Sequence, residues 1–110
     1  MIENKKKIMV IVPPLSGHVN PICGLVHELC KKEKEVEVIF YSDEEYREPI
    51  EKTGAKLRLY SHPTYSRLPR VNVREAKDPI GDLMNLQISF AYELLPQLLN
   101  DVDEIQPDLI

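Results

Sequence analysis

The chain has 110 residues, of which 43% are hydrophobic and 29% charged, and its net charge at pH 7 is −4. This composition is typical of a folded domain, and the acidic balance disfavours nucleic acid and anionic membranes as partners. No stretch reaches the roughly 18 apolar residues of a membrane-spanning helix. Cys23 and Cys30 lie one heptad apart on a predicted helix, too far apart to pair, which favours a reducing, cytoplasmic location.

Residues 8–21, IMVIVPPLSGHVNP, predict a short buried strand, a tight turn and a helix. Pro13 and Pro14 end the strand. Asn20 is a favoured N-cap residue and Pro21 a favoured first helical residue, so we expect the helix to run from about 21 to 33. This places His18 at the carboxyl end of a strand, which is where open α/β sheets bind ligands.

The next segments continue the alternation of strands and helices. Residues 36–41 (VEVIFY) predict a second strand, and Ser42 with Glu45 predicts a capping box for a short second helix. That helix contains Pro49 and ends at Gly54, and residues 56–60 alternate as a third strand does. The pattern predicts an α/β fold, a Rossmann-like parallel βαβαβ sheet.

Residues 62–110 do not continue this alternation of short strands and helices. Residues 62–79 contain three prolines and no period, so we expect a long irregular loop, which in a compact domain is usually functional. A long helix is expected over about 80–105, kinked at Pro96. A fourth strand begins at residues 107–110 and does not continue, so we expect the chain to be the front of a larger protein.

His18 has two interpretations. A histidine in a loop often does no more than hydrogen-bond a backbone carbonyl. Next to a helix N-terminus, however, the positive end of the helix dipole disfavours a charged ring, and a neutral imidazole is a competent general base. The hypothesis is that His18 deprotonates a hydroxyl group of the substrate.

Other chemistries receive less support from the sequence. No G-x-G-x-x-G pattern follows the first strand, which argues against a dinucleotide cofactor and a nicotinamide oxidoreductase. Cys23, His27 and Cys30 have metal-ligand spacing on one helix flank but lack a fourth ligand, so we expect no metal site. Ser16 and His18 lack the G-x-S-x-G pattern of a nucleophile elbow.

Four aromatic residues are candidates for an apolar acceptor pocket. For Phe90, a place in the core is at least as plausible as a place in the pocket. The candidates are Tyr60, Tyr65, Phe90 and Tyr92.

Gly17, His18 and Pro21, following the apolar strand, resemble the amino-terminal G-H-x-x-P signature of family 1 UDP-sugar-dependent glycosyltransferases. The likeness continues through T-G-A at 53–55, L-L-P at 94–96 and P-D-L-I at 107–110, so it covers nearly the whole chain. Within this family, the chain looks closer to the soluble bacterial macrolide-type and plant enzymes. The resemblance implies that residues 1–110 are part of the amino-terminal, acceptor-binding domain of a GT-B fold, without the carboxyl-terminal donor-binding domain.

The resemblance also implies a mechanism. His18 would take a proton from a hydroxyl of a small lipophilic acceptor, which attacks the anomeric carbon and expels UDP with inversion. The family's Asp that orients this histidine would lie beyond Ile110, and the UDP-sugar is a co-substrate bound by the missing domain. We therefore expect no cofactor, no turnover by the 110 residues alone, and acceptor contacts from Ser16, Gly17, Tyr65 and Phe90.

One alternative stays open. The chain would then be a short non-catalytic module that docks on a separate donor-binding subunit, and it would expose an apolar face for that purpose.

Overall fold

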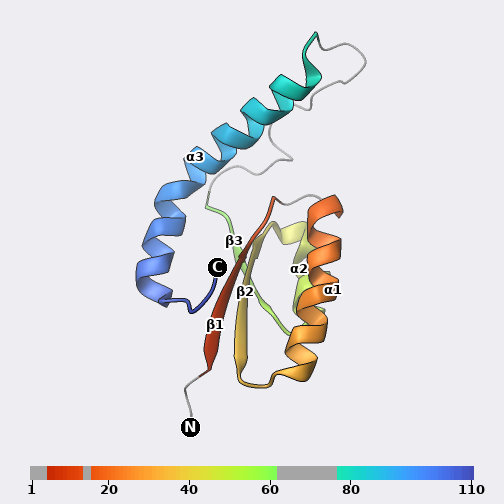
Figure 1. Ribbon diagram of the computed structural model, residues 1–110, viewed down its shortest axis with the longest axis vertical. Helices are drawn as coiled ribbons and strands as arrows, with labels where there is room; N and C mark the ends of the chain where they lie inside the picture. The colour runs from red at the N-terminus through yellow and green to blue at the C-terminus, as the bar shows by residue number, and fades with distance from the viewer. Residues whose placement is uncertain (1–4, 14–15, 62–76) are drawn as a thin grey trace.

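The computed structural model describes residues 5–13, 16–61 and 77–110 and confirms the expected alternation of strands and helices (Figure 1). The elements, in chain order, are β1 (Lys6–Ile11), α1 (Ser16–Lys32), β2 (Val36–Ser42), the 3₁₀ turn η1 (Glu44–Tyr46), α2 (Arg47–Lys52), β3 (Lys56–Leu59) and α3 (Pro79–Ile105).

The strands form a parallel sheet in the order β1-β2-β3. On its other edge, β1 pairs in parallel with the segment after α3, through a bridge between Ile8 and Leu109. The Met9 amide donates to the Leu109 carbonyl at 2.9 Å. The strand order therefore reverses at β1, which lies between β2 and the Leu109 segment, as at the ligand-binding switch point of doubly wound folds.

The helices cover both faces of the sheet, with α1 and α2 on one side and α3 on the other (Figure 1). Successive strand residues point to opposite faces. Val38 and Phe40 therefore pack in the cluster formed with α1 and α2, whereas Ile39 and Tyr41 pack in the cluster with α3. This placement follows from right-handed crossovers, because the chain moves away from β1 through α1 and α2 and returns past it through α3.

Helix α1 begins at Ser16, one turn earlier than expected, and Pro21 lies inside it. The prediction that Asn20 caps the helix is therefore wrong. Val19 is completely buried in the α1–α2 cluster. Burial of this side chain requires the first turn to be helical, so tertiary packing overrides the local preference for Pro21 at the first helical position. Leu25, also on α1, is 66% exposed.

The capping box at Ser42 is also wrong. Ser42 is the last residue of β2, and Asp43 holds the N-cap position of η1 without a side-chain capping bond. The expected end of α2 is confirmed, because Gly54 has a φ of 99°. Only glycine adopts this left-handed conformation without strain.

Helix α3 begins at Pro79, and the carboxylate of Asp78 accepts a hydrogen bond from the Gly81 amide at 3.1 Å. The helix continues through Pro96, and its ribbon changes direction within the blue half (Figure 1). From Phe90 onward the helix packs on the sheet, through Phe90, Leu94 and Ile105. The adjoining side carries the outer stripe of α3, six apolar side chains that are 47–77% exposed: Ile80, Met84, Ile88, Tyr92, Leu95 and Leu99.

Candidate functional site

His18 lies in the first turn of α1, immediately beyond the carboxyl end of β1, and its side chain is exposed. The strand ends because Pro13 has no amide hydrogen to continue the ladder. Val19, the residue directly after His18, is completely buried and belongs to α1. The imidazole is therefore held by a regular helix at the ligand-binding edge of the sheet, rather than by the loop that the sequence suggested.

A buried tyrosine, Tyr60, contacts the backbone of Val12, the residue directly before Pro13 and Pro14. The Tyr60 hydroxyl donates to the Val12 carbonyl at 2.7 Å. Its ring stands between two other aromatic rings, with centroids 5.7 Å from Tyr41 and 5.5 Å from Phe90. Tyr60 is only 7% exposed and belongs to the buried cluster on the α3 face.

Of the other four predicted site residues, two lie beside His18, one lies in the core and one lies outside the described residues. Ser16 and Gly17 share the first turn of α1 with His18, and Gly17 is exposed. Phe90 is 5% exposed and packs edge-on against Tyr60, which is the core placement that the sequence left open for it. Tyr65 lies outside the described residues. Contact of these four residues with an acceptor stays a prediction.

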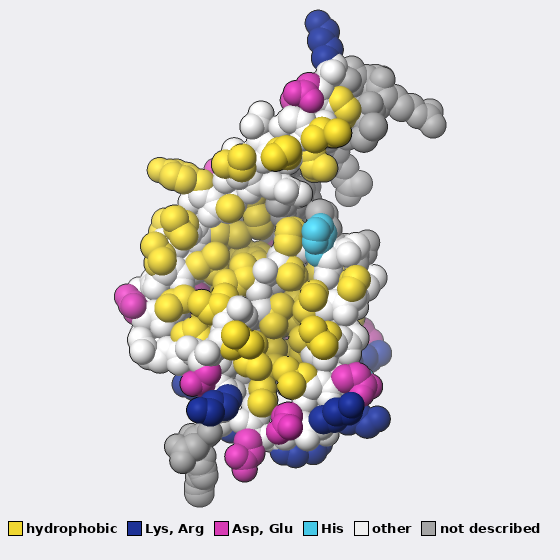
Figure 2. Space-filling model, viewed as in Figure 1, with side chains coloured by type: hydrophobic (Ala, Val, Ile, Leu, Met, Phe, Trp, Pro, Cys, Tyr) yellow, Lys and Arg dark blue, Asp and Glu magenta, His cyan; other side chains and the backbone are white. Residues whose placement is uncertain are grey.

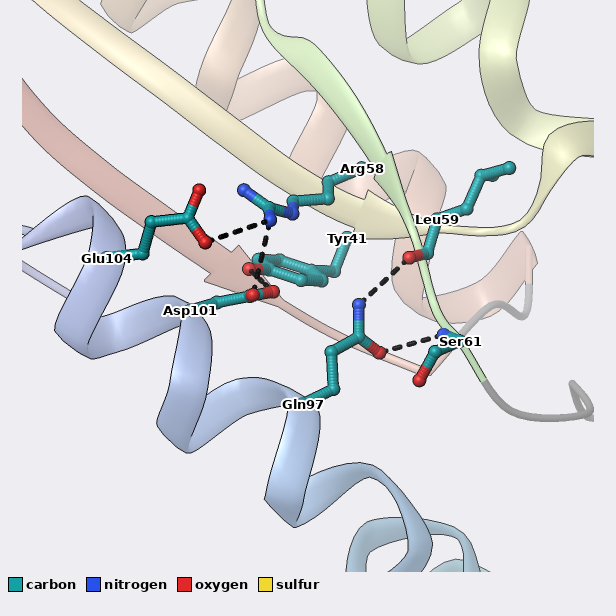
Figure 3. A network of polar contacts seen from close by, with 7 residues as sticks. All are labelled: Tyr41, Arg58, Leu59, Ser61, Gln97, Asp101 and Glu104. Atoms are coloured by element: carbon teal, nitrogen blue, oxygen red, sulfur yellow. Dashed lines mark hydrogen bonds and ion pairs between the residues drawn. The ribbon is translucent and has the colours of Figure 1, made fainter.

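A polar network on the α3 face was not predicted from the sequence (Figure 3). Asp101 is 3% exposed, and its carboxylate accepts from the Tyr41 hydroxyl at 2.7 Å and from the Arg58 guanidinium at 3.2 Å. Burial, followed by the hydrogen bond to Asp101, raises the pKa of Tyr41 well above its ordinary value. An aspartate among apolar helix positions, at 101 between Leu98 and Ile105, is the signal that could have revealed it.

Gln97 adds a second link between α3 and β3. Its side-chain nitrogen donates to the Leu59 carbonyl at 3.1 Å, and its oxygen accepts from the Ser61 amide at 2.8 Å (Figure 3). The side-chain amide thus pairs with the backbone on both sides of Tyr60, as a neighbouring strand would. This fixes the position where β3 ends.

The structure provides no metal centre among the residues that it describes. Cys23 and Cys30 pack against the α1–α2 cluster, and burial raises the pKa of both thiols. His27 is exposed. A hollow of about 390 Å³ lies at the opposite, amino-terminal edge of the sheet, away from His18, and is lined by ion-pairing side chains that include Glu37 and Lys56.

None of the described helices is long and apolar enough to cross a membrane. No protein-family model matches the chain. The chain is, however, 32% identical over 106 residues to the NDP-glycosyltransferase YjiC of Bacillus subtilis (strain 168). The match covers 96% of the chain and 26% of that protein.

The chain is therefore homologous to part of that NDP-glycosyltransferase. A solved structure agrees in fold: the crystal structure of CalG4, the calicheamicin glycosyltransferase, superimposes with a TM-score of 0.72 at 19% identity. That match covers 97% of the chain and 26% of CalG4. The fold is therefore that of part of a GT-B glycosyltransferase, and the chain spans about a quarter of the length of the glycosyltransferases that it matches.

Proposed function

We propose that the chain forms the acceptor-binding side of an inverting glycosyltransferase, with His18 as the general base. The observation that carries this proposal is the exposed His18 in the first turn of α1, beside the strand where the strand order reverses. This edge is where doubly wound folds bind ligands. The homology to NDP-glycosyltransferases supports the same reaction class.

In the proposed reaction, the His18 imidazole accepts the proton of an acceptor hydroxyl. The acceptor oxygen bonds to the anomeric carbon of a UDP-sugar while the bond from that carbon to the diphosphate oxygen breaks. UDP leaves, and the configuration at the anomeric carbon inverts. Proton transfer to a positioned base of this kind contributes about 10²- to 10⁴-fold to the rate.

The proposed acceptor is a small lipophilic alcohol or phenol. Ser16 and Gly17, which share the helical turn of His18, would contact it, together with Tyr65 and Phe90. Apolar side chains that α3 exposes, such as Ile80, support a lipophilic acceptor. The UDP-sugar would bind to a second domain outside the 110 residues, in the cytoplasm.

The test compares His18→Ala with His27→Ala in the complete transferase. Both histidines are exposed on α1, so neither change should lower the free energy of unfolding by more than about 0.5 kcal/mol. We expect kcat to fall about 10²- to 10⁴-fold in His18→Ala and to remain unchanged in His27→Ala. Normal turnover in His18→Ala would overturn the proposed role, and turnover by residues 1–110 alone would overturn the need for a second domain.

A second candidate is a non-catalytic module that pairs with a separate donor-binding subunit. It is favoured by apolar side chains left exposed beside the sheet edge, which include Leu95, Leu99 and Leu109. Figure 2 shows hydrophobic side chains gathered over the middle of this face and along α3. Sequencing the native transcript past Ile110 separates the candidates, because a continuing open frame supports the first and an immediate stop the second.

A further inference from the structure

The backbone carbonyl of Val12 lies just past the end of β1. The next two residues, Pro13 and Pro14, have no amide hydrogen to donate to it. An unpaired carbonyl in a partly buried position costs about 1–3 kcal/mol. Among the described residues, the donor to this carbonyl comes from a distant part of the chain.

That donor is the Tyr60 hydroxyl, 2.7 Å from the Val12 carbonyl. Tyr60 follows β3, and β2 lies between β3 and β1, so the side chain crosses the carboxyl edge of the whole sheet. Its ring rests on the Tyr41 ring of the intervening strand and against the Phe90 ring of α3. These contacts leave the hydroxyl little freedom to point elsewhere.

The backbone of Tyr60 is held as well. Gln97 of α3 pairs with the Leu59 carbonyl and the Ser61 amide, which flank Tyr60 on both sides (Figure 3). A continuous set of hydrogen bonds and ring contacts thus runs from α3 through Tyr60 to the end of β1. Residue 12 is only six positions before His18.

We propose that Tyr60 is a positioning residue, which holds the end of β1 so that His18 stands at a fixed distance from the acceptor hydroxyl. The inference rests on the proposed function of His18. General-base catalysis requires the base within hydrogen-bond reach of the proton, and a misplacement of about 1 Å costs up to about 10²-fold in rate. Tyr60 itself does not touch the substrate.

The decisive variant is Tyr60→Phe in the complete transferase, because it removes one oxygen and keeps the buried ring. One matched control removes the same atom elsewhere. Tyr41→Phe removes a buried hydroxyl that is bound to Asp101 and does not reach β1. We expect kcat to fall about tenfold or more in Tyr60→Phe only, with KM for the UDP-sugar unchanged.

A second readout does not depend on turnover. We expect the backbone amide NMR signals of Gly17 and His18 to shift in Tyr60→Phe and not in Tyr41→Phe. If Tyr60→Phe does not fold, Gln97→Met serves instead, since it removes both bonds to the backbone around Tyr60 and keeps the side-chain length. It should lower kcat in the same direction, and an unchanged kcat would overturn the proposal.

His18→Ala, measured in parallel, separates the two ideas. Wild-type kcat in Tyr60→Phe together with an inactive His18→Ala overturns the positioning role and leaves the proposed function intact. Full activity in His18→Ala overturns the proposed function, and with it the catalytic part of this inference. In that case unchanged amide signals would also exclude Tyr60 as the residue that holds the turn.

Discussion

The two faces of the sheet are held to their helices by different interactions. On the α1–α2 face, the helices meet the strands through an apolar cluster in which Val19, Val38 and Phe40 are completely or almost completely buried. On the α3 face, an apolar cluster is accompanied by a buried carboxylate, a tyrosine hydroxyl and a glutamine amide that join the helix to the strands. Hydrophobic burial thus holds both faces, and directed hydrogen bonds are added on the α3 face.

The difference has a physical reason in α3 itself. Besides its buried side, α3 carries the outer stripe, so apolar residues occupy a broad arc of its surface. Hydrophobic burial is non-directional and would accept several rotations of such a helix. Asp101 can be paired in only one of them, and an unpaired buried carboxylate is costly. The polar contacts thereby select the rotation that also supports Tyr60.

The largest effect on stability is expected on the apolar face. Phe40→Ala removes a completely buried side chain from the centre of β2 and leaves a cavity. We expect the free energy of unfolding to fall by about 3–5 kcal/mol. Urea unfolding of the purified protein measures this. A loss below about 1 kcal/mol would show that this face is not packed as described.

A smaller loss is expected from Asp101→Ala, which leaves the Tyr41 hydroxyl and the Arg58 guanidinium without their shared acceptor. We expect about 2–3 kcal/mol, the usual value for hydrogen bonds to a buried charge. The control is Asp103→Ala, an exposed carboxylate on the same helix, which should change stability by less than about 0.5 kcal/mol. Equal effects of the two variants would contradict the selective role of the network.

The smallest effect is expected from Tyr41→Phe, which removes one neutral donor and costs about 1 kcal/mol at pH 7. The pKa of Tyr41 is raised by burial and by Asp101 above its ordinary value of 10.0. A raised pKa contributes stability below pH 10 that is lost as the pH rises, because only the unfolded chain then releases the proton. The stability difference between the wild type and Tyr41→Phe should therefore narrow between pH 7 and pH 11 in urea unfolding; a constant difference would exclude this linkage.

Local patterns in the sequence predicted the order of elements well. The apolar run before Pro13 and the β-branched run 36–41 each became a strand, and Gly54 ended α2 in the left-handed conformation. The start of α1 could not be predicted from the local sequence, because Asn20 is a favoured N-cap residue and Pro21 a favoured first helical residue. Burial of Val19 against the sheet decided against it.

The candidate site also combines features that the sequence determined with features that only the tertiary structure showed. The sequence alone determined the fold class, the family resemblance and His18 as a candidate base, because these depend on residue types and spacings along the chain. Only the tertiary structure showed that the Tyr60 hydroxyl meets the Val12 carbonyl, 48 residues away, and that Asp101 meets Tyr41, 60 residues away. Such pairs are decided by strand order and by helix rotation, which no local pattern specifies.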